Sequence, residues 1–104
     1  MTITEPITLD QAKKFLRVEH SLEDDLILSL ISVARSIVEF YQGRLIAERD
    51  TEEEYTPPSP AEIQAMYLLI AHYYENRNAA TPNELKELPY GVKALLYFNR
   101  EPIV

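Results

Sequence analysis

The sequence predicts an all-α domain of about four helices, two long and two short. Hydrophobic residues recur at helical spacing through most of the chain, helix-start signals precede these stretches, and prolines or glycines follow the longer ones. At 104 residues, of which 46% are hydrophobic, the chain can build one core but not two. We therefore expect residues 1–104 to form a single domain.

The first two helices have clear boundaries in the sequence. Thr8 and Gln11 form a capping box, which predicts a short helix to about Arg17. Ser21, followed by three carboxylates, predicts the start of a long helix that Gly43 ends. Its apolar positions form one broad stripe of two neighbouring rows, namely Leu22, Leu26, Leu30, Val33, Ile37 and Tyr41, and Ile27, Ile31, Ala34 and Val38.

An irregular connection is expected between the second and third helices. Residues 44–58 show no sustained period, carry the acidic run 52–54, and end in Pro57 and Pro58, which exclude a helix there. A short strand fits around residues 44–47. We expect the whole segment to be exposed and mobile, with the acidic run forming a solvated loop.

The third helix begins with Ser59 at the cap, Pro60 at the first position and Glu62 at the third. Its apolar residues cover nearly its whole circumference, which is typical of a helix buried on several sides. In so small a domain this favours contact with a partner chain. A last apolar segment, residues 85–98, predicts a final short helix that Pro89 can start.

The excess of apolar surface suggests where partners bind. Tyrosine offers a large apolar area with a polar tip and is enriched at interfaces. We expect Tyr73, beside Leu69, to point outward from the third helix. The candidate interface residues are Leu69, Tyr73, Tyr90, Leu96 and Tyr97.

No catalytic, cofactor or metal site is expected. The chain has no cysteine and only two glycines, which excludes thiol chemistry and glycine-rich phosphate loops. His20 with Glu23 and His72 with Glu75 each place two metal-ligating groups on one helix face. Neither pair has the further ligands of a known helical metal motif, so we interpret both histidines as structural.

Charge and hydropathy exclude other classes. The net charge of −7 makes the chain a poor general binder of DNA, because such binding depends on Lys and Arg neutralising phosphates. No apolar run is long enough to span a membrane, and residues 1–8 do not resemble a secretory signal. We expect a protein that is made and used inside a cell.

Three blocks of sequence resemble the head–tail connector proteins of long-tailed bacteriophages, which are often described as DNA-packaging proteins. Residues 7–44 read ITLDQAKKFLRVEHSLEDDLILSLISVARSIVEFYQGR, residues 68–77 read LLIAHYYENR, and residues 87–100 read ELPYGVKALLYFNR. Their order is that of the family. The segment at 44–58 is shorter than the strand-forming segment usual there.

The resemblance implies a structural adaptor rather than an enzyme. Connector subunits form a closed ring of roughly a dozen copies, through a heterologous interface. The ring joins the portal protein to a neck or tail completion protein, and DNA passes through it without specific binding. A carboxylate-lined channel would repel the phosphate backbone. The resemblance thus implies a virion protein at the head–tail junction, present in the host cytoplasm during assembly.

Two other classes of function remain open from the sequence. One is a small helical regulatory or interaction module that binds a single protein partner. The other is an enzyme with an unrecognised metal site. The mass of the protein, measured alone and with a portal protein, distinguishes the first from a connector, because a connector forms large rings or joins a portal, whereas a module stays monomeric or dimeric. A metal assay by mass spectrometry addresses the second.

Overall fold

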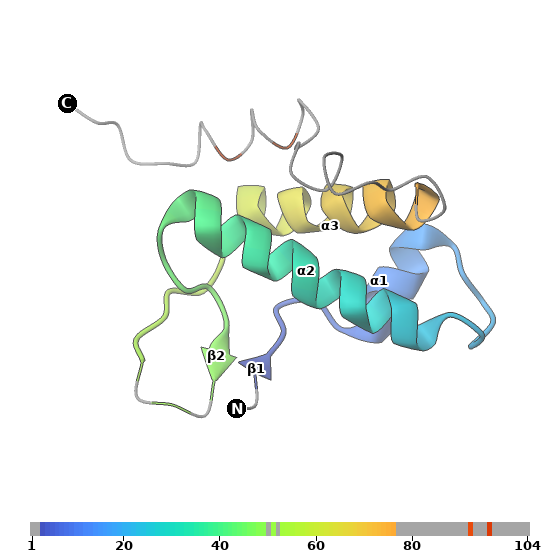
Figure 1. The fold of residues 1–104 in the computed structure, drawn as a ribbon, viewed down its shortest axis with the longest axis horizontal. Helices are drawn as coiled ribbons and strands as arrows, with labels where there is room; N and C mark the ends of the chain where they lie inside the picture. The colour runs from blue at the N-terminus through green and yellow to red at the C-terminus, as the bar shows by residue number, and fades with distance from the viewer. Residues whose placement is uncertain (1–2, 50, 52, 77–91, 93–95, 97–104) are drawn as a thin grey trace.

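Helices dominate the computed structural model of the chain, which describes residues 3–49, 51, 53–76, 92 and 96 (Figure 1). The elements in chain order are β1 (Ile3–Thr4), α1 (Leu9–Leu16), α2 (Asp24–Gln42), β2 (Glu48–Arg49) and α3 (Pro60–Glu75). The predicted helical architecture is confirmed for these residues. The fourth predicted helix lies in a segment of which only Val92 and Leu96, both helical, are described.

Two of the three helices start where the sequence predicts. At α1, the backbone N–H of Gln11 donates to the Thr8 hydroxyl and the N–H of Thr8 donates to the Gln11 side chain. Ser59 and Glu62 make the same reciprocal pair at α3. Each box satisfies two backbone donors that the first helical turn leaves unpaired.

The predicted start of α2, with Ser21 as the cap, is wrong by two residues. The helix begins at Asp24, and Glu23 occupies the cap position without a side-chain cap hydrogen bond. Asp24 and Asp25 lie in its first turn, where carboxylates interact favourably with the positive end of the helix dipole. The predicted carboxylates in the first turn are therefore confirmed, and the predicted cap residue, Ser21, is wrong.

Two helices end in the left-handed conformation. Gly43 ends α2 with φ of 69°, and Arg17 ends α1 with φ of 61°. A side chain in this region brings Cβ close to the carbonyl oxygen, which costs about 1–2 kcal/mol for residues other than glycine. The cap at Arg17 therefore carries a conformational cost that the cap at Gly43 avoids.

Exchanging these two residue types should have opposite effects on stability. Gly43→Ala should lower the free energy of unfolding by about 1 kcal/mol, because a Cβ at residue 43 has no atom within 4 Å and only the backbone cost applies. Arg17→Gly should raise it by about 0.5–1 kcal/mol. Urea denaturation followed by circular dichroism measures both, and a destabilised Arg17→Gly variant would contradict the account.

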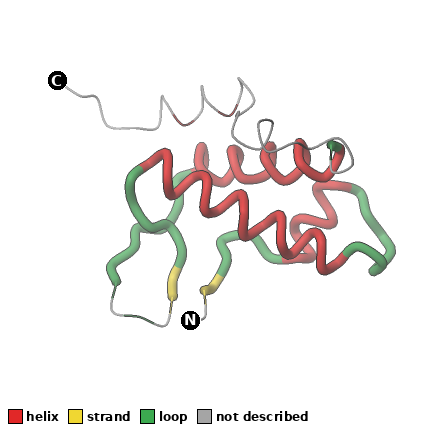
Figure 2. The backbone as a smooth tube through the Cα atoms, viewed as in Figure 1, coloured by secondary structure: helices red, strands yellow, loops and turns green. Residues whose placement is uncertain are grey.

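The core lies between α2 and α3, which run side by side, with α1 packed against both (Figure 2). Each helix has a fully buried alanine, namely Ala12, Ala34 and Ala65, and such small side chains allow close approach of the backbones. The core cluster contains Ile7, Ala12, Ile27, Ile31, Ala34, Val38, Ile46, Ala65, Met66, Leu69, Ile70, Tyr73, Val92 and Leu96.

Only one of the two apolar rows of α2 faces the centre of this core. Ile27, Ile31, Ala34 and Val38 are buried, whereas Leu22 and Val33 from the other row are 89% and 38% exposed. The broad apolar stripe is therefore only partly buried, since Leu30, Ile37 and Tyr41 of the second row pack against the core while Leu22 and Val33 do not. The second row lies at the edge of the core and continues into solvent.

A short antiparallel ribbon joins the N-terminal segment to the connection after α2. β1 pairs with β2 in the register Ile3 with Arg49 and Thr4 with Glu48. The strand expected around residues 44–47 thus lies slightly later, and its partner was not expected. The connection is also less exposed than predicted, because Ile46 and Ala47 are buried, while Glu53 and Glu54 are exposed as expected.

Candidate assembly surface

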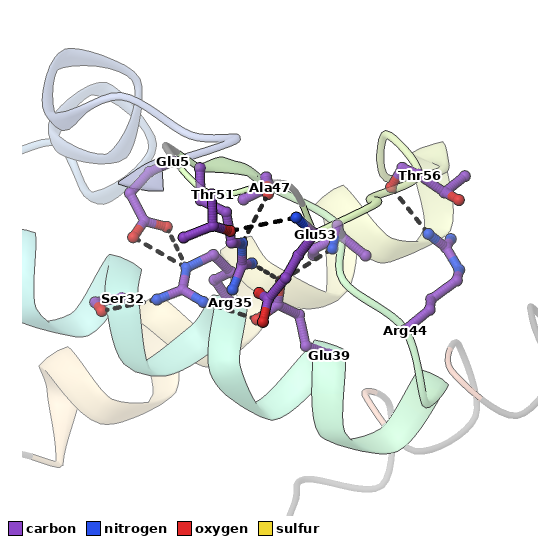
Figure 3. A network of polar contacts seen from close by, with 11 residues as sticks. Glu5, Ser32, Arg35, Glu39, Arg44, Ala47, Thr51, Glu53 and Thr56 are labelled. Atoms are coloured by element: carbon purple, nitrogen blue, oxygen red, sulfur yellow. Dashed lines mark hydrogen bonds and ion pairs between the residues drawn. The ribbon is translucent and has the colours of Figure 1, made fainter. Parts of the chain in front are cut away.

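A buried network of ion pairs fixes α2 against the ribbon (Figure 3). Arg35 of α2 is its centre, with a side chain that is only 7% exposed. Its Nε lies 3.0 and 2.8 Å from the two carboxylate oxygens of Glu5, and its Nη1 lies 2.7 Å from Oε1 of Glu39. Its Nη2 donates to the Ser32 hydroxyl at 3.3 Å.

Glu39 carries the network on to β2. Its Oε2 accepts a hydrogen bond from the backbone N–H of Ile46 at 2.9 Å and another from Nη2 of Arg49 at 2.7 Å. The Arg49 side chain is 6% exposed. We call Glu5, Arg35, Glu39 and Arg49 the polar clamp, because together they connect the segment after β1, α2 and β2.

The polar clamp orients α2 relative to the ribbon. Two arginines and two glutamates balance in charge, and each buried arginine has a carboxylate partner within hydrogen-bond distance. Buried charges are tolerated when they are paired in this way. The network fixes Arg35 and Glu39 toward the ribbon, and together with the buried apolar row of α2 it sets which side of the helix faces solvent.

A second buried pair holds the beginning of α3. Glu62 is fully buried, and its carboxylate accepts from Arg44 and from the backbone N–H of Ser59. Arg44 also donates to the Thr56 carbonyl oxygen at 2.9 Å. One carboxylate therefore serves both as the capping-box residue of α3 and as the anchor of the preceding connection.

The outward side of α2 carries little charge. The exposed residues of the helix are Asp25, Leu28, Ser29, Val33, Ser36 and Phe40, and only Asp25 is charged. Phe40 is 82% exposed and Leu28 is 48% exposed. A solvated helix face normally carries charged or polar residues, and exposed large apolar side chains mark interaction sites when they cluster. We call these six residues the outer face of α2.

A smaller aromatic feature lies where α1 meets α3. Phe15 stacks on Tyr67 with ring centroids 4.7 Å apart, and 43% of Phe15 is exposed. Nearby, the hydroxyl of Tyr74 donates to Glu23 at 2.7 Å, and Lys13 lies 2.8 Å from Asp24. These contacts fix the end of α3 and the end of α1 against the start of α2.

The expected outward pair on α3 lies in the core instead. Leu69 is fully buried and Tyr73 is 4% exposed, so the expectation that they point outward is wrong. Leu96 is also buried, while Tyr90 and Tyr97 lie outside the described residues. Burial raises the pKa of the Tyr73 hydroxyl, and the neighbouring Tyr41 raises it further. No described residue of the predicted interface set therefore offers free surface on a single subunit.

The histidine pairs have ordinary structural contacts. His20 Nδ1 accepts from the backbone N–H of Leu22 at 3.2 Å, and the His72 ring lies edge-on to Tyr73 at 5.3 Å. Within the described residues, no three or more His, Cys, Asp or Glu side chains gather where they could hold a metal ion. In the same part of the chain, no helix has the length and apolar character needed to cross a membrane.

Sequence reasoning missed the residues that define this surface. Arg35 and Glu39 are spaced four apart on one helix, which is a signal for an ion pair. The partners Glu5 and Arg49 are not separable from other surface charges in the sequence. Phe40 follows Glu39 near the end of a long apolar stripe. The sequence does not show which side of α2 faces the core, so it does not predict that Phe40 is exposed.

Comparison with known families identifies the class of protein to which the chain belongs. Residues 6–100 match the family model described as phage gp6-like head-tail connector protein, and the chain belongs to this family. It is thus a structural component of a phage particle that interacts with other particle proteins. Comparison with curated proteins and with solved structures finds no match.

Proposed function

We propose that this chain joins the portal of a phage or prophage head to the next neck or tail protein as a ring of identical subunits through which DNA passes. The observation that carries the proposal is the family match, which spans nearly the whole chain. A structural role agrees with the described residues, whose buried polar groups form ion pairs and helix caps.

A ring requires two different contact surfaces on each subunit, because a heterologous interface joins unlike patches. Tyr90 and Tyr97, from the sequence-predicted interface, are the proposed contacts on one side. Phe15, which is stacked on Tyr67 and partly exposed, is a candidate on the other. Leu69, Tyr73 and Leu96 contribute by holding the core that supports these contacts.

The test is the mass of the protein with its portal. Light scattering of the chain mixed with the portal protein of the same phage should give a complex that holds many copies of the chain. A single copy bound to one protein partner would instead support a regulatory module. Tyr97→Glu should reduce the number of bound copies, and Tyr55→Glu, at an exposed tyrosine of the connection, is the matched control.

The chain should not bind duplex DNA at physiological salt more tightly than roughly 10⁻⁴ M, the weak end of non-specific binding. The physical reason is the net charge of −7, with 17 acidic against 10 basic residues. Fluorescence anisotropy with a random-sequence duplex measures this. A micromolar, salt-sensitive change would contradict both the prediction and a channel that repels DNA.

A further inference from the structure

Along α2, one line of side chains has the spacing of a coiled-coil seam. The seam consists of Leu22, Leu26, Ser29, Val33, Ser36 and Phe40, which are separated by alternating steps of four and three residues. It overlaps the outer face of α2 and begins in the turn just before the helix. Within it, large apolar side chains alternate with serine from Leu26 to Phe40. We call these six residues the α2 seam.

The α2 seam faces solvent in the single subunit. Leu22 and Phe40, at its two ends, are among the most exposed large apolar side chains of the described residues. Ser29 and Ser36 are exposed, and Leu26 is half-buried. The seam is therefore available to another helix without any change in the core.

The order of side chains in the seam is self-complementary when reversed. Two copies of the seam can be placed antiparallel, related by a two-fold axis at the level of residue 31. In this register Leu26 faces Ser36, and Ser29 faces Val33. At the ends, Leu22 faces Phe40. Every serine thus meets a large apolar side chain, and alternating small and large residues at facing positions allow two surfaces to interdigitate. A parallel copy would place serine against serine and phenylalanine against phenylalanine.

Electrostatics favour the same partner. No residue of the α2 seam is charged, whereas the whole chain carries a net charge of −7. Two copies of an acidic protein repel least where they meet through an uncharged surface. The antiparallel arrangement also sets the two helix dipoles in opposite directions.

We propose that the α2 seam binds the α2 seam of a second copy of this chain, antiparallel and about a two-fold axis near residue 31. Such a contact is isologous, because the same patch is used on both subunits, and it closes at two copies. It is separate from the heterologous ring contact proposed above. The pair is a state of the free chain, and its presence or absence does not depend on the ring.

Engineered cysteines test the register, because the chain has none of its own. Leu22→Cys and Phe40→Cys are prepared as separate full-length variants and mixed under oxidising conditions. The mixture should give a disulfide-linked dimer that contains one copy of each variant. Neither variant alone should cross-link. The two copies of residue 40 each lie nine residues of helix from the two-fold axis, on opposite sides of it, and are therefore about 27 Å apart along the helix direction. The two copies of residue 22 likewise lie at opposite ends of the pair.

The cross-linking outcomes are decisive in both directions. A mixed dimer that forms only when both variants are present supports the antiparallel register. Efficient cross-linking of either variant with itself indicates a parallel arrangement and overturns the proposal. The absence of a mixed dimer also overturns it.

Sedimentation equilibrium gives an independent test. The wild-type chain should show a reversible monomer–dimer equilibrium, and Ser29→Glu should raise its dissociation constant at least about tenfold, since it places a charge opposite Val33 of the other copy. Gln64→Glu, which adds the same charge at an exposed position of α3, is the matched control and should have no effect. An unchanged dissociation constant in Ser29→Glu, or a monomeric wild type at every concentration, overturns the proposal.

Discussion

Tyr73→Glu should unfold most of the chain at room temperature rather than release an intact subunit. Tyr73 is 4% exposed and belongs to the core between α2 and α3. Burying a carboxylate without a partner costs several kcal/mol, and the aromatic contacts are lost in addition. The total stability of a domain of this size is about 5–15 kcal/mol. Far-ultraviolet circular dichroism should therefore lose most of its helical signal.

Two control variants separate burial from the chemistry of the substitution. Tyr73→Phe retains the ring and should cost only about 1 kcal/mol. Tyr55→Glu makes the same change at a tyrosine that is 41% exposed, and it should alter stability by less than about 0.5 kcal/mol. A Tyr73→Glu variant with full helical signal and wild-type thermal stability would show that Tyr73 faces solvent, as the sequence suggested.

Arg35→Met should lower the free energy of unfolding by about 3 kcal/mol. Methionine fills much of the space of the arginine stem, but it leaves Glu5 without its partner and removes one of the two arginines that bind Glu39. Removing one member of a buried ion pair typically costs about 3–5 kcal/mol. The lower figure is expected because Glu5 is 25% exposed and can be hydrated. Urea denaturation measures the change.

The reciprocal variant distinguishes the network from the packing of the arginine side chain. Glu5→Gln should cost less than Arg35→Met, because Arg35 retains Glu39 at 2.7 Å. In the double variant the losses should be less than additive, since both substitutions remove the same ion pair. Additive losses would mean that Glu5 and Arg35 do not interact in solution, and the polar clamp would then fail as an account of how α2 is held.

Local signals in the sequence were sufficient for most helix boundaries. The two capping boxes need only residues three apart in the chain, and Gly43 ends α2 through its own backbone preference. These interactions are formed within one turn, so the sequence alone specifies them. Ser21 is not the cap of α2, since Glu23, two residues later, occupies that position.

The orientation of α2 could not be predicted in the same way. Both of its rows are apolar, and periodicity does not tell which row faces the core when the stripe is broad. The polar clamp contributes to this orientation, and its partners are distant in the chain, since Arg35 and Glu5 are 30 positions apart. The β1–β2 ribbon was missed because each strand has only two residues, too few for a period.

Helix α3 was interpreted correctly as buried on several sides but with the wrong covering element. Its apolar circumference suggested a partner chain at Leu69 and Tyr73. In the structure both residues belong to a core cluster that also contains Val92 and Leu96 from the C-terminal part of the same chain. A sequence pattern reports that a face is covered, and only the structure shows what covers it.

The most direct test of the connector assignment is the copy number of this chain in purified phage particles. Quantitative mass spectrometry of intact particles, with the portal protein as the internal reference, should find the chain at about one copy per portal subunit, the ratio expected for a stacked ring of matching symmetry. Its absence from intact particles, or a content far below that of the portal, would contradict a role at the head–tail junction.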